Sequence, residues 1–139
     1  MTLLTSFKAL MLSLACLILL GCASKVPGIK VEQLLKTDQS WDRTPYAAYP
    51  AGQPEISVLK ITIPANTTLN WHTHPMPNVA YVLAGELLVE TRDGKHKITV
   101  TPGQVLPEVV QTEHRGTSGK EPVELIVFYA GSEGMPLSK

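Results

Sequence analysis

The feature that most constrains the fold is a repeated alternation of short apolar runs with turn formers, beginning near Trp41. Each run has five to eight residues and many β-branched side chains, and clusters of Pro, Gly and Asn separate the runs. The connections are too short for crossover helices, so we expect antiparallel strands in an all-β barrel or jelly roll that hides its edges. The predicted strands are 56–63, 69–74, 79–83, 86–91, 96–100, 105–111 and 123–130.

Two segments add detail to this expectation. The run "VELIVFYA" at 123–130 is apolar on both faces apart from Glu124, which predicts a central strand covered on both sides. Ahead of the strands, "IKVEQLLKTDQSWD" places Val31, Leu34 and Leu35 at helical spacing. We therefore expect one short N-terminal helix before the β region.

The first 22 residues have the composition of an export signal. Lys8 precedes an apolar run over residues 9–20. That run is too short to span a bilayer, which takes about 20 apolar residues. The run ends in Leu-Leu-Gly-Cys, which resembles a bacterial lipobox and implies that Cys22 becomes a lipidated N-terminus. The alternative is an ordinary signal peptide that ends in an incidental cysteine.

This leader predicts three parts: a signal peptide at 1–21, a lipidated N-terminus with a short tether at 22–30, and a single domain at 31–139. Acyl chains on Cys22 would anchor the protein to a membrane without spanning it. Residue 23 is alanine rather than aspartate, which favours the periplasmic side of the outer membrane. We therefore expect a lipid-anchored protein of the cell envelope.

Cysteine content and charge exclude several classes of protein. Cys16 leaves with the signal and Cys22 is acylated, so no thiol remains for a disulfide or a thiolate metal site. All twelve acidic residues but only eleven of the twelve basic residues remain after cleavage, and no basic block is present. Nucleic acid is therefore not an expected partner.

Two of the four histidines stand one residue apart in "NWHTHP". Residues i and i+2 of a strand project to the same side, so His72 and His74 point together. Two imidazoles on one face can reach one metal ion with bonds of about 2.0 to 2.1 Å. His114, at the end of a strand in "QTEHRG", is the candidate for the third ligand, whereas His96 beside the "RDGK" turn is expected at the surface. The competing interpretation treats His72 and His74 as polar residues on an exposed face and His114 as a loop residue.

This pattern resembles the cupin superfamily, whose first motif contains His-x-His and a later glycine. His72, His74 and the segment "YVLAGEL", with Gly85, match that motif, and Asn66 stands where the family's early glycine falls. In the second motif a histidine follows a glycine by eleven residues, as His114 follows Gly103 here. The resemblance covers about 56–129 and implies a cupin-type antiparallel β-barrel.

The chain departs from the family at one ligand position, because Asn78 replaces the glutamate of the first motif. The resemblance therefore implies a divalent metal held by three histidines, with Asn78 at most a weak carbonyl donor. Zn, Fe, Mn, Ni and Cu all suit such a shell. Glu108 shares strand parity with His114, and we take it as the candidate proton carrier.

Functions of different classes remain open. The first is a metal-dependent enzyme that acts on a small molecule bound at the open metal positions. The second is a non-catalytic small-molecule binding or sensing module, and the third is a structural envelope lipoprotein. Small cupins are often similar in forming homodimers, so a second copy of the chain is also a candidate partner.

Overall fold

Antiparallel strands make up all of the regular secondary structure in the part of the chain that a computed structural model describes, residues 28–139. All seven lie in one compact unit, Glu32–Lys139. They are β1 (Pro54–Ile63), β2 (Asn78–Ala84), β3 (Leu87–Thr91), β4 (Lys97–Val100), β5 (Val105–Pro107), β6 (His114–Ser118) and β7 (Val123–Ser132). The all-β prediction is confirmed. The signal peptide and Cys22 lie outside the described residues.

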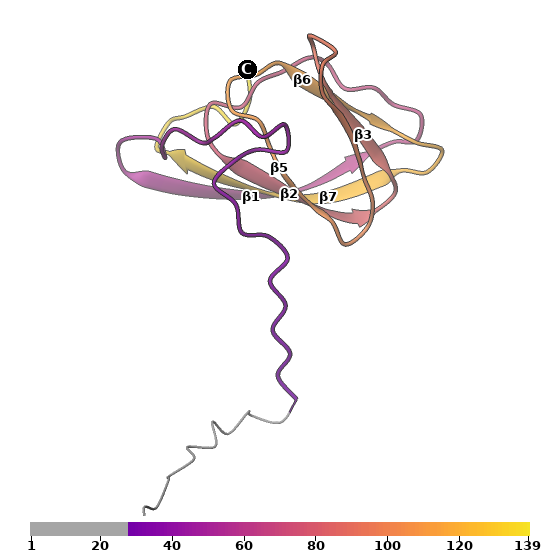
Figure 1. Ribbon diagram of the computed structural model, residues 1–139, viewed down its shortest axis with the longest axis horizontal. Helices are drawn as coiled ribbons and strands as arrows, with labels where there is room; N and C mark the ends of the chain where they lie inside the picture. Colours follow the sequence, from indigo (N-terminus) through magenta and orange to yellow (C-terminus); the bar gives the residue numbers. More distant parts are fainter. Residues whose placement is uncertain (1–27) are drawn as a thin grey trace, which may run out of the picture. The chain divides into compact units, whose positions relative to one another are not determined.

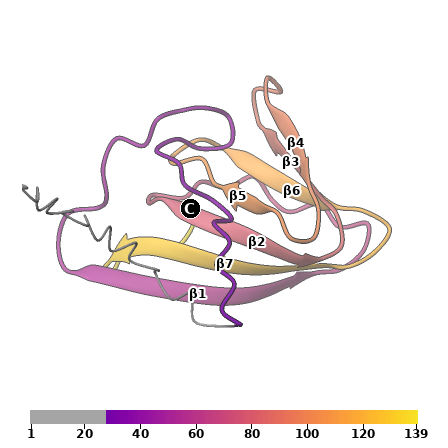
Figure 2. The ribbon, with the colours of Figure 1, turned by 60° about the horizontal axis from the view of Figure 1, so that its bottom comes forward.

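The strands form two sheets that face each other (Figures 1 and 2). One sheet has the order β1-β7-β2-β5 and the other the order β4-β3-β6. Alternate side chains of both sheets point inward, as the period of two requires. Together they form the core, which consists of Ile63, Met76, Ala80, Val82, Leu87, Val89, Val100, Leu106, Val123, Leu125, Val127 and Tyr129.

The strand β7 is central in its sheet, between β1 and β2, as its apolar sequence predicts. The second half of that prediction is wrong, because its burial alternates and Phe128 is 37% exposed. Phe128 pairs with Val58 of β1 and Val79 of β2 on the outer face of the sheet. The outward side chains of Ile126 and Phe128 are therefore apolar but only partly covered by the described chain.

Two strand assignments differ from the prediction. Residues 69–74 form only isolated bridges, including one between His72 and His114, rather than a regular ladder. No strand was predicted between residues 111 and 123, yet His114–Ser118 forms β6 beside β3. Gly116 explains why a glycine occurs in this strand: a Cβ there would lie 2.9 Å from a methyl carbon of Leu87.

The predicted N-terminal helix is absent from the described residues, since the segment around Leu34 and Leu35 has no regular secondary structure. A short helix in water depends on burying its apolar stripe against the rest of the protein. Here Leu34 is 54% exposed, so the stripe has no surface that covers it. Within residues 28–139 no helix has the length and apolarity to cross a membrane.

Gly85 lies at the corner where the chain passes from one sheet to the other, between β2 and β3. Its φ is +77°, and a Cβ there would lie 2.3 Å from the Pro122 carbonyl oxygen. Gly94, in the turn between β3 and β4, has a similar φ of +70° but nothing within 4 Å of such a Cβ. Substituting each glycine by alanine therefore distinguishes two costs: backbone strain alone at Gly94, and backbone strain with steric overlap at Gly85.

We expect Gly94→Ala to lower the free energy of unfolding by about 1–2 kcal/mol, because only the left-handed backbone is strained. Gly85→Ala carries the same strain and must also displace the backbone at the start of β7, so its cost exceeds about 3 kcal/mol. Urea unfolding followed by tryptophan fluorescence measures both values. Equal losses for the two variants would show that the contact with Pro122 is not tight.

Candidate metal centre

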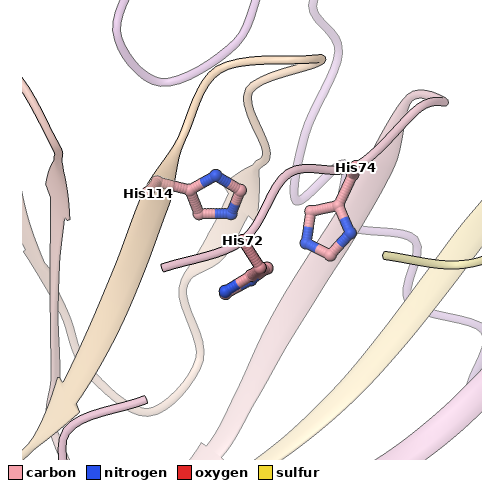
Figure 3. Close-up of side chains that lie close together, drawn as sticks. All are labelled: His72, His74 and His114. Atoms are coloured by element: carbon pink, nitrogen blue, oxygen red, sulfur yellow. The ribbon is translucent and has the colours of Figure 1, made fainter. Parts of the chain in front are cut away.

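Three histidines from two distant segments, His72 and His74 on one and His114 on the other, converge at one place (Figure 3). The ring centroids of His72 and His114 lie 4.5 Å apart, and the ring centroid of His74 lies 5.0 Å from that of His72 and 5.1 Å from that of His114. One ring nitrogen from each lies within 4.8 Å of the other two. His74 and His114 are buried, with 5% and 2% exposure, whereas His72 is half-buried. His96 is exposed and lies outside this group, as expected.

Backbone hydrogen bonds hold the segment that carries His72 and His74 beside the segment that carries His114. His72 and His114 exchange two hydrogen bonds, in which each N–H donates to the other's carbonyl, at 3.1 Å and 3.0 Å. The Gln111 N–H donates to the His74 carbonyl at 2.8 Å. The segment is thus extended, although it is not a regular strand, and its alternation turns His72 and His74 to one side. The predicted convergence of the three histidines is confirmed.

The orientation of each imidazole is set by a backbone carbonyl. Nδ1 lies 2.9 Å from the Asn70 oxygen in His72, 2.7 Å from the Leu137 oxygen in His74 and 2.8 Å from the Thr112 oxygen in His114. A carbonyl only accepts hydrogen bonds, so each Nδ1 carries the hydrogen. Each neutral ring therefore keeps its Nε2 lone pair free, which is the usual arrangement of histidines that bind metals.

The C-terminal segment is a functional element that the sequence did not reveal. The Thr73 and Lys139 backbones exchange hydrogen bonds at 2.9 Å and 3.0 Å, on the edge of the histidine segment that does not face β6. This pairing brings the Leu137 carbonyl to His74. Nothing in the sequence "GMPLSK" predicts a strand, because its contribution comes from backbone groups alone.

Glu108 is the carboxylate next to the histidines. Its Oε2 lies 3.3 Å from His114 Nε2, and its side chain is only 12% exposed. Neither atom has a hydrogen-bond partner within the described residues. The parity argument that selected Glu108 does not hold, since β5 ends at Pro107 and Gln111 has a positive φ of 57°. A loop, rather than a continuous strand, brings Glu108 to His114.

Asn78 and Tyr129 complete the buried polar surroundings. Asn78 is buried on β2, and its Oδ1 also has no hydrogen-bond partner among the described residues. Asn78 pairs with Tyr129 of β7, whose ring packs edge-on against His74 with centroids 5.6 Å apart. Tyr129 lies in an apolar run, so nothing in the residue pattern indicates its place beside the site.

Burial and the nearby carboxylate move the pKa values of two histidines in opposite directions. Burial is the main effect at His74 and lowers its pKa. Burial also opposes protonation of His114, but Glu108 beside Nε2 outweighs it, so the pKa of His114 is raised. Burial, with a smaller contribution from Glu108, raises the pKa of Tyr129. His74 is thus held in the neutral form that ligation requires, whereas at His114 a proton competes with a metal ion.

The segment that begins at Trp41 packs against the edge strand beside this site. The Trp41 N–H donates to the Pro107 carbonyl at 2.8 Å, and the Tyr46 hydroxyl donates to the Glu108 carbonyl at 2.8 Å. A cleft of about 490 Å³ lies between this segment and the outer face of β2 and β7. None of the three histidines lines that cleft.

The residues present fit a divalent transition metal. Three neutral imidazole nitrogens and one carboxylate are ligands that Zn, Fe, Mn, Ni and Cu accept. The buried His114 Nε2, Glu108 Oε2 and Asn78 Oδ1 have no hydrogen-bond partners among the described residues. A buried polar atom without a partner costs free energy, and a bound cation would remove that cost.

Comparison with known proteins identifies the fold. A profile described as a cupin domain matches residues 59–129, and a search of curated proteins found no match. The chain is similar to the DMSP lyase DddQ from Ruegeria pomeroyi, with a TM-score of 0.52, 20% identity and coverage of 58% of this chain and 41% of the lyase. The corresponding values for the polyketide cyclase RemF from Streptomyces resistomycificus are 0.52, 17%, 63% and 61%.

A third similar structure is a Klebsiella pneumoniae protein with a double-stranded β-helix domain. Its TM-score is 0.51 at 18% identity, with coverage of 66% of this chain and 84% of that protein. The chain spans only about two fifths of the length of the DMSP lyases it is similar to. At these identities the similarity shows the fold and not the reaction.

Deletion of residues 135–139 should lower the affinity for Zn²⁺ by about 10- to 100-fold, because His74 loses the carbonyl that orients its ring. Leu137→Ala is the matched control, since it removes the packing of that side chain but keeps the carbonyl. Competition with a chelator measures both affinities. If the deletion binds Zn²⁺ as tightly as the wild type, the tail does not position His74.

Proposed function

Since this chain belongs to the cupin family, we propose that it is a metal-dependent enzyme that acts on a small molecule in the bacterial cell envelope. The observation that carries the proposal is the convergence of three imidazoles whose Nε2 atoms are kept free by hydrogen bonds at Nδ1. Buried Glu108 adds a carboxylate at 3.3 Å from one of them. The similar DMSP lyase and polyketide cyclase are examples of enzymes built on this scaffold.

The residues of the site have two roles, metal binding and proton transfer. His72, His74 and His114 would hold the metal, which would supply a Lewis acid for an oxygen of the substrate. Glu108 Oε2 is the nearest carboxylate oxygen and takes up a proton from the bound molecule. The core side chains around β2 and β7 keep bulk water away from His74 and His114.

A binding or sensing module is the second candidate, and the enclosure of the site favours it. Only His72 is half-exposed, and none of the three histidines lines the cleft of about 490 Å³, which reaches the site only at Asn78. Asn78 also leaves the first motif without its usual carboxylate. In this reading the metal anchors a ligand through the open positions and no bond of the ligand is broken.

The full chain should bind about one equivalent of divalent metal, whereas a His72→Ala, His74→Ala double variant should bind none. His96→Ala is the matched control, because His96 is exposed and outside the group. Elemental analysis of the purified proteins measures the metal content. Equal content in the double variant and the wild type would reject the site.

The same preparation separates the two functions. Oxygen uptake or turnover of a panel of small metabolites, lost in the double variant, supports the enzyme. A thermal shift caused by a metabolite without any turnover supports the binding module instead.

We also propose that Cys22 is acylated and anchors the domain to the outer membrane; the lipobox sequence and the short polar tether after it support this. Cys22→Ala should abolish incorporation of labelled palmitate and move the protein from the membrane fraction to the soluble fraction. Cys16→Ala is the control, since that residue lies within the expected signal peptide. Unchanged labelling of Cys22→Ala would reject the anchor.

A further inference from the structure

The carboxylate missing from the first motif has a replacement across the sheet. In the pairing of β2 with β5, Val79 lies opposite Pro107, so the next pair along the same register is Asn78 and Glu108. The Glu108 N–H donates to the Asn78 carbonyl at 3.0 Å, which keeps the two residues paired beyond the end of β5. Directly opposite residues of antiparallel strands project to the same face. Glu108 therefore projects to the face that position 78 serves in the family.

From this placement we infer that Glu108 is itself a metal ligand, and that it supplies from the loop after β5 the carboxylate that Asn78 lacks. The inference rests on the proposed metal site but not on catalysis. A carboxylate bound to the metal takes up a proton only after a substrate displaces it. The role of Glu108 as proton carrier therefore belongs to the substrate complex.

The distance between Glu108 Oε2 and His114 Nε2 fits two ligands of one ion. Bonds of about 2.0 to 2.2 Å at tetrahedral or octahedral angles place neighbouring ligand atoms about 3 to 3.5 Å apart. The two atoms lie 3.3 Å apart, yet no hydrogen bond joins them. Both are buried and both lack another partner among the described residues.

Charge supports the same assignment. Within residues 28–139 Glu108 forms no ion pair with a lysine or an arginine, although its side chain is only 12% exposed. An unpaired buried carboxylate is unfavourable, and a divalent cation would pair with it. The Tyr46 hydroxyl donates to the Glu108 carbonyl at 2.8 Å and so helps to hold the backbone of the residue whose side chain carries this charge.

The test compares Glu108→Gln, which keeps the volume and removes the charge, with the wild type and Glu113→Gln. Glu113 adjoins His114 in sequence, but its exposed carboxylate pairs with Arg92. We expect Glu108→Gln to weaken Co²⁺ and Zn²⁺ binding by about 10- to 100-fold and to change the visible absorption spectrum of bound Co²⁺. Glu113→Gln should match the wild type in both measurements.

Thermal unfolding of the same full-length proteins excludes a merely structural role. Without metal and at a pH above the raised pKa of His114, where Glu108 has no charged partner, Glu108→Gln should be at least as stable as the wild type, and added Zn²⁺ should raise its Tm less. A wild-type Co²⁺ spectrum and affinity in Glu108→Gln would overturn the inference. So would a loss of stability without metal that leaves the Co²⁺ spectrum unchanged.

The outcome is distinguishable from failure of the proposed function. If the His72→Ala, His74→Ala variant loses metal while Glu108→Gln retains wild-type affinity, the three-histidine site stands and the carboxylate ligand does not. If Glu108→Gln loses affinity and no turnover is found for the wild type, the ligand assignment stands without an enzyme.

Discussion

The backbone pairing of His72 with His114 is the interaction on which the rest of the site depends. These residues are 42 positions apart, and two hydrogen bonds hold them directly opposite each other. The strand β6 pairs with β3 along one edge, and His114 at its start pairs with His72 along the other, so the sheet positions His114 beside the histidine segment. The fold therefore closes the loop between His72 and His114, and closing this loop lowers the conformational entropy of the chain. The packed core of the two sheets offsets that cost.

The polar atoms of the site fall into two sets: some are held by hydrogen bonds, and others have no hydrogen-bond partner in the described chain. The three Nδ1 atoms are hydrogen-bonded to carbonyls, so the rings have little freedom to turn. In contrast, the nitrogen of His114 that faces Glu108 and the oxygens of Glu108 and Asn78 lack partners in the described chain. Pre-oriented donors around unsatisfied atoms are typical of a site arranged for a ligand rather than for stability alone.

The sequence predicted what depends on local periodicity and missed what depends on distant backbone. The spacing of His72 and His74 specifies a common direction wherever the chain is extended, so their convergence was predictable. The strand at His114–Ser118 was not, because Gly116 and its polar neighbours are typical of turns and only packing against Leu87 explains them. Glu108 reached the site through a loop that strand parity does not describe. The helix at Leu34 failed because tertiary burial, which sequence spacing does not reveal, is what stabilises short helices.

The use of main-chain carbonyls to orient the imidazoles has a consequence for how such a site is recognised. Asn70, Thr112 and Leu137 contribute a backbone oxygen that every amino acid possesses, so the ring contacts themselves do not require particular side chains at these positions. The identities of these three residues therefore do not reveal that they orient the imidazoles. Only the path of the backbone does.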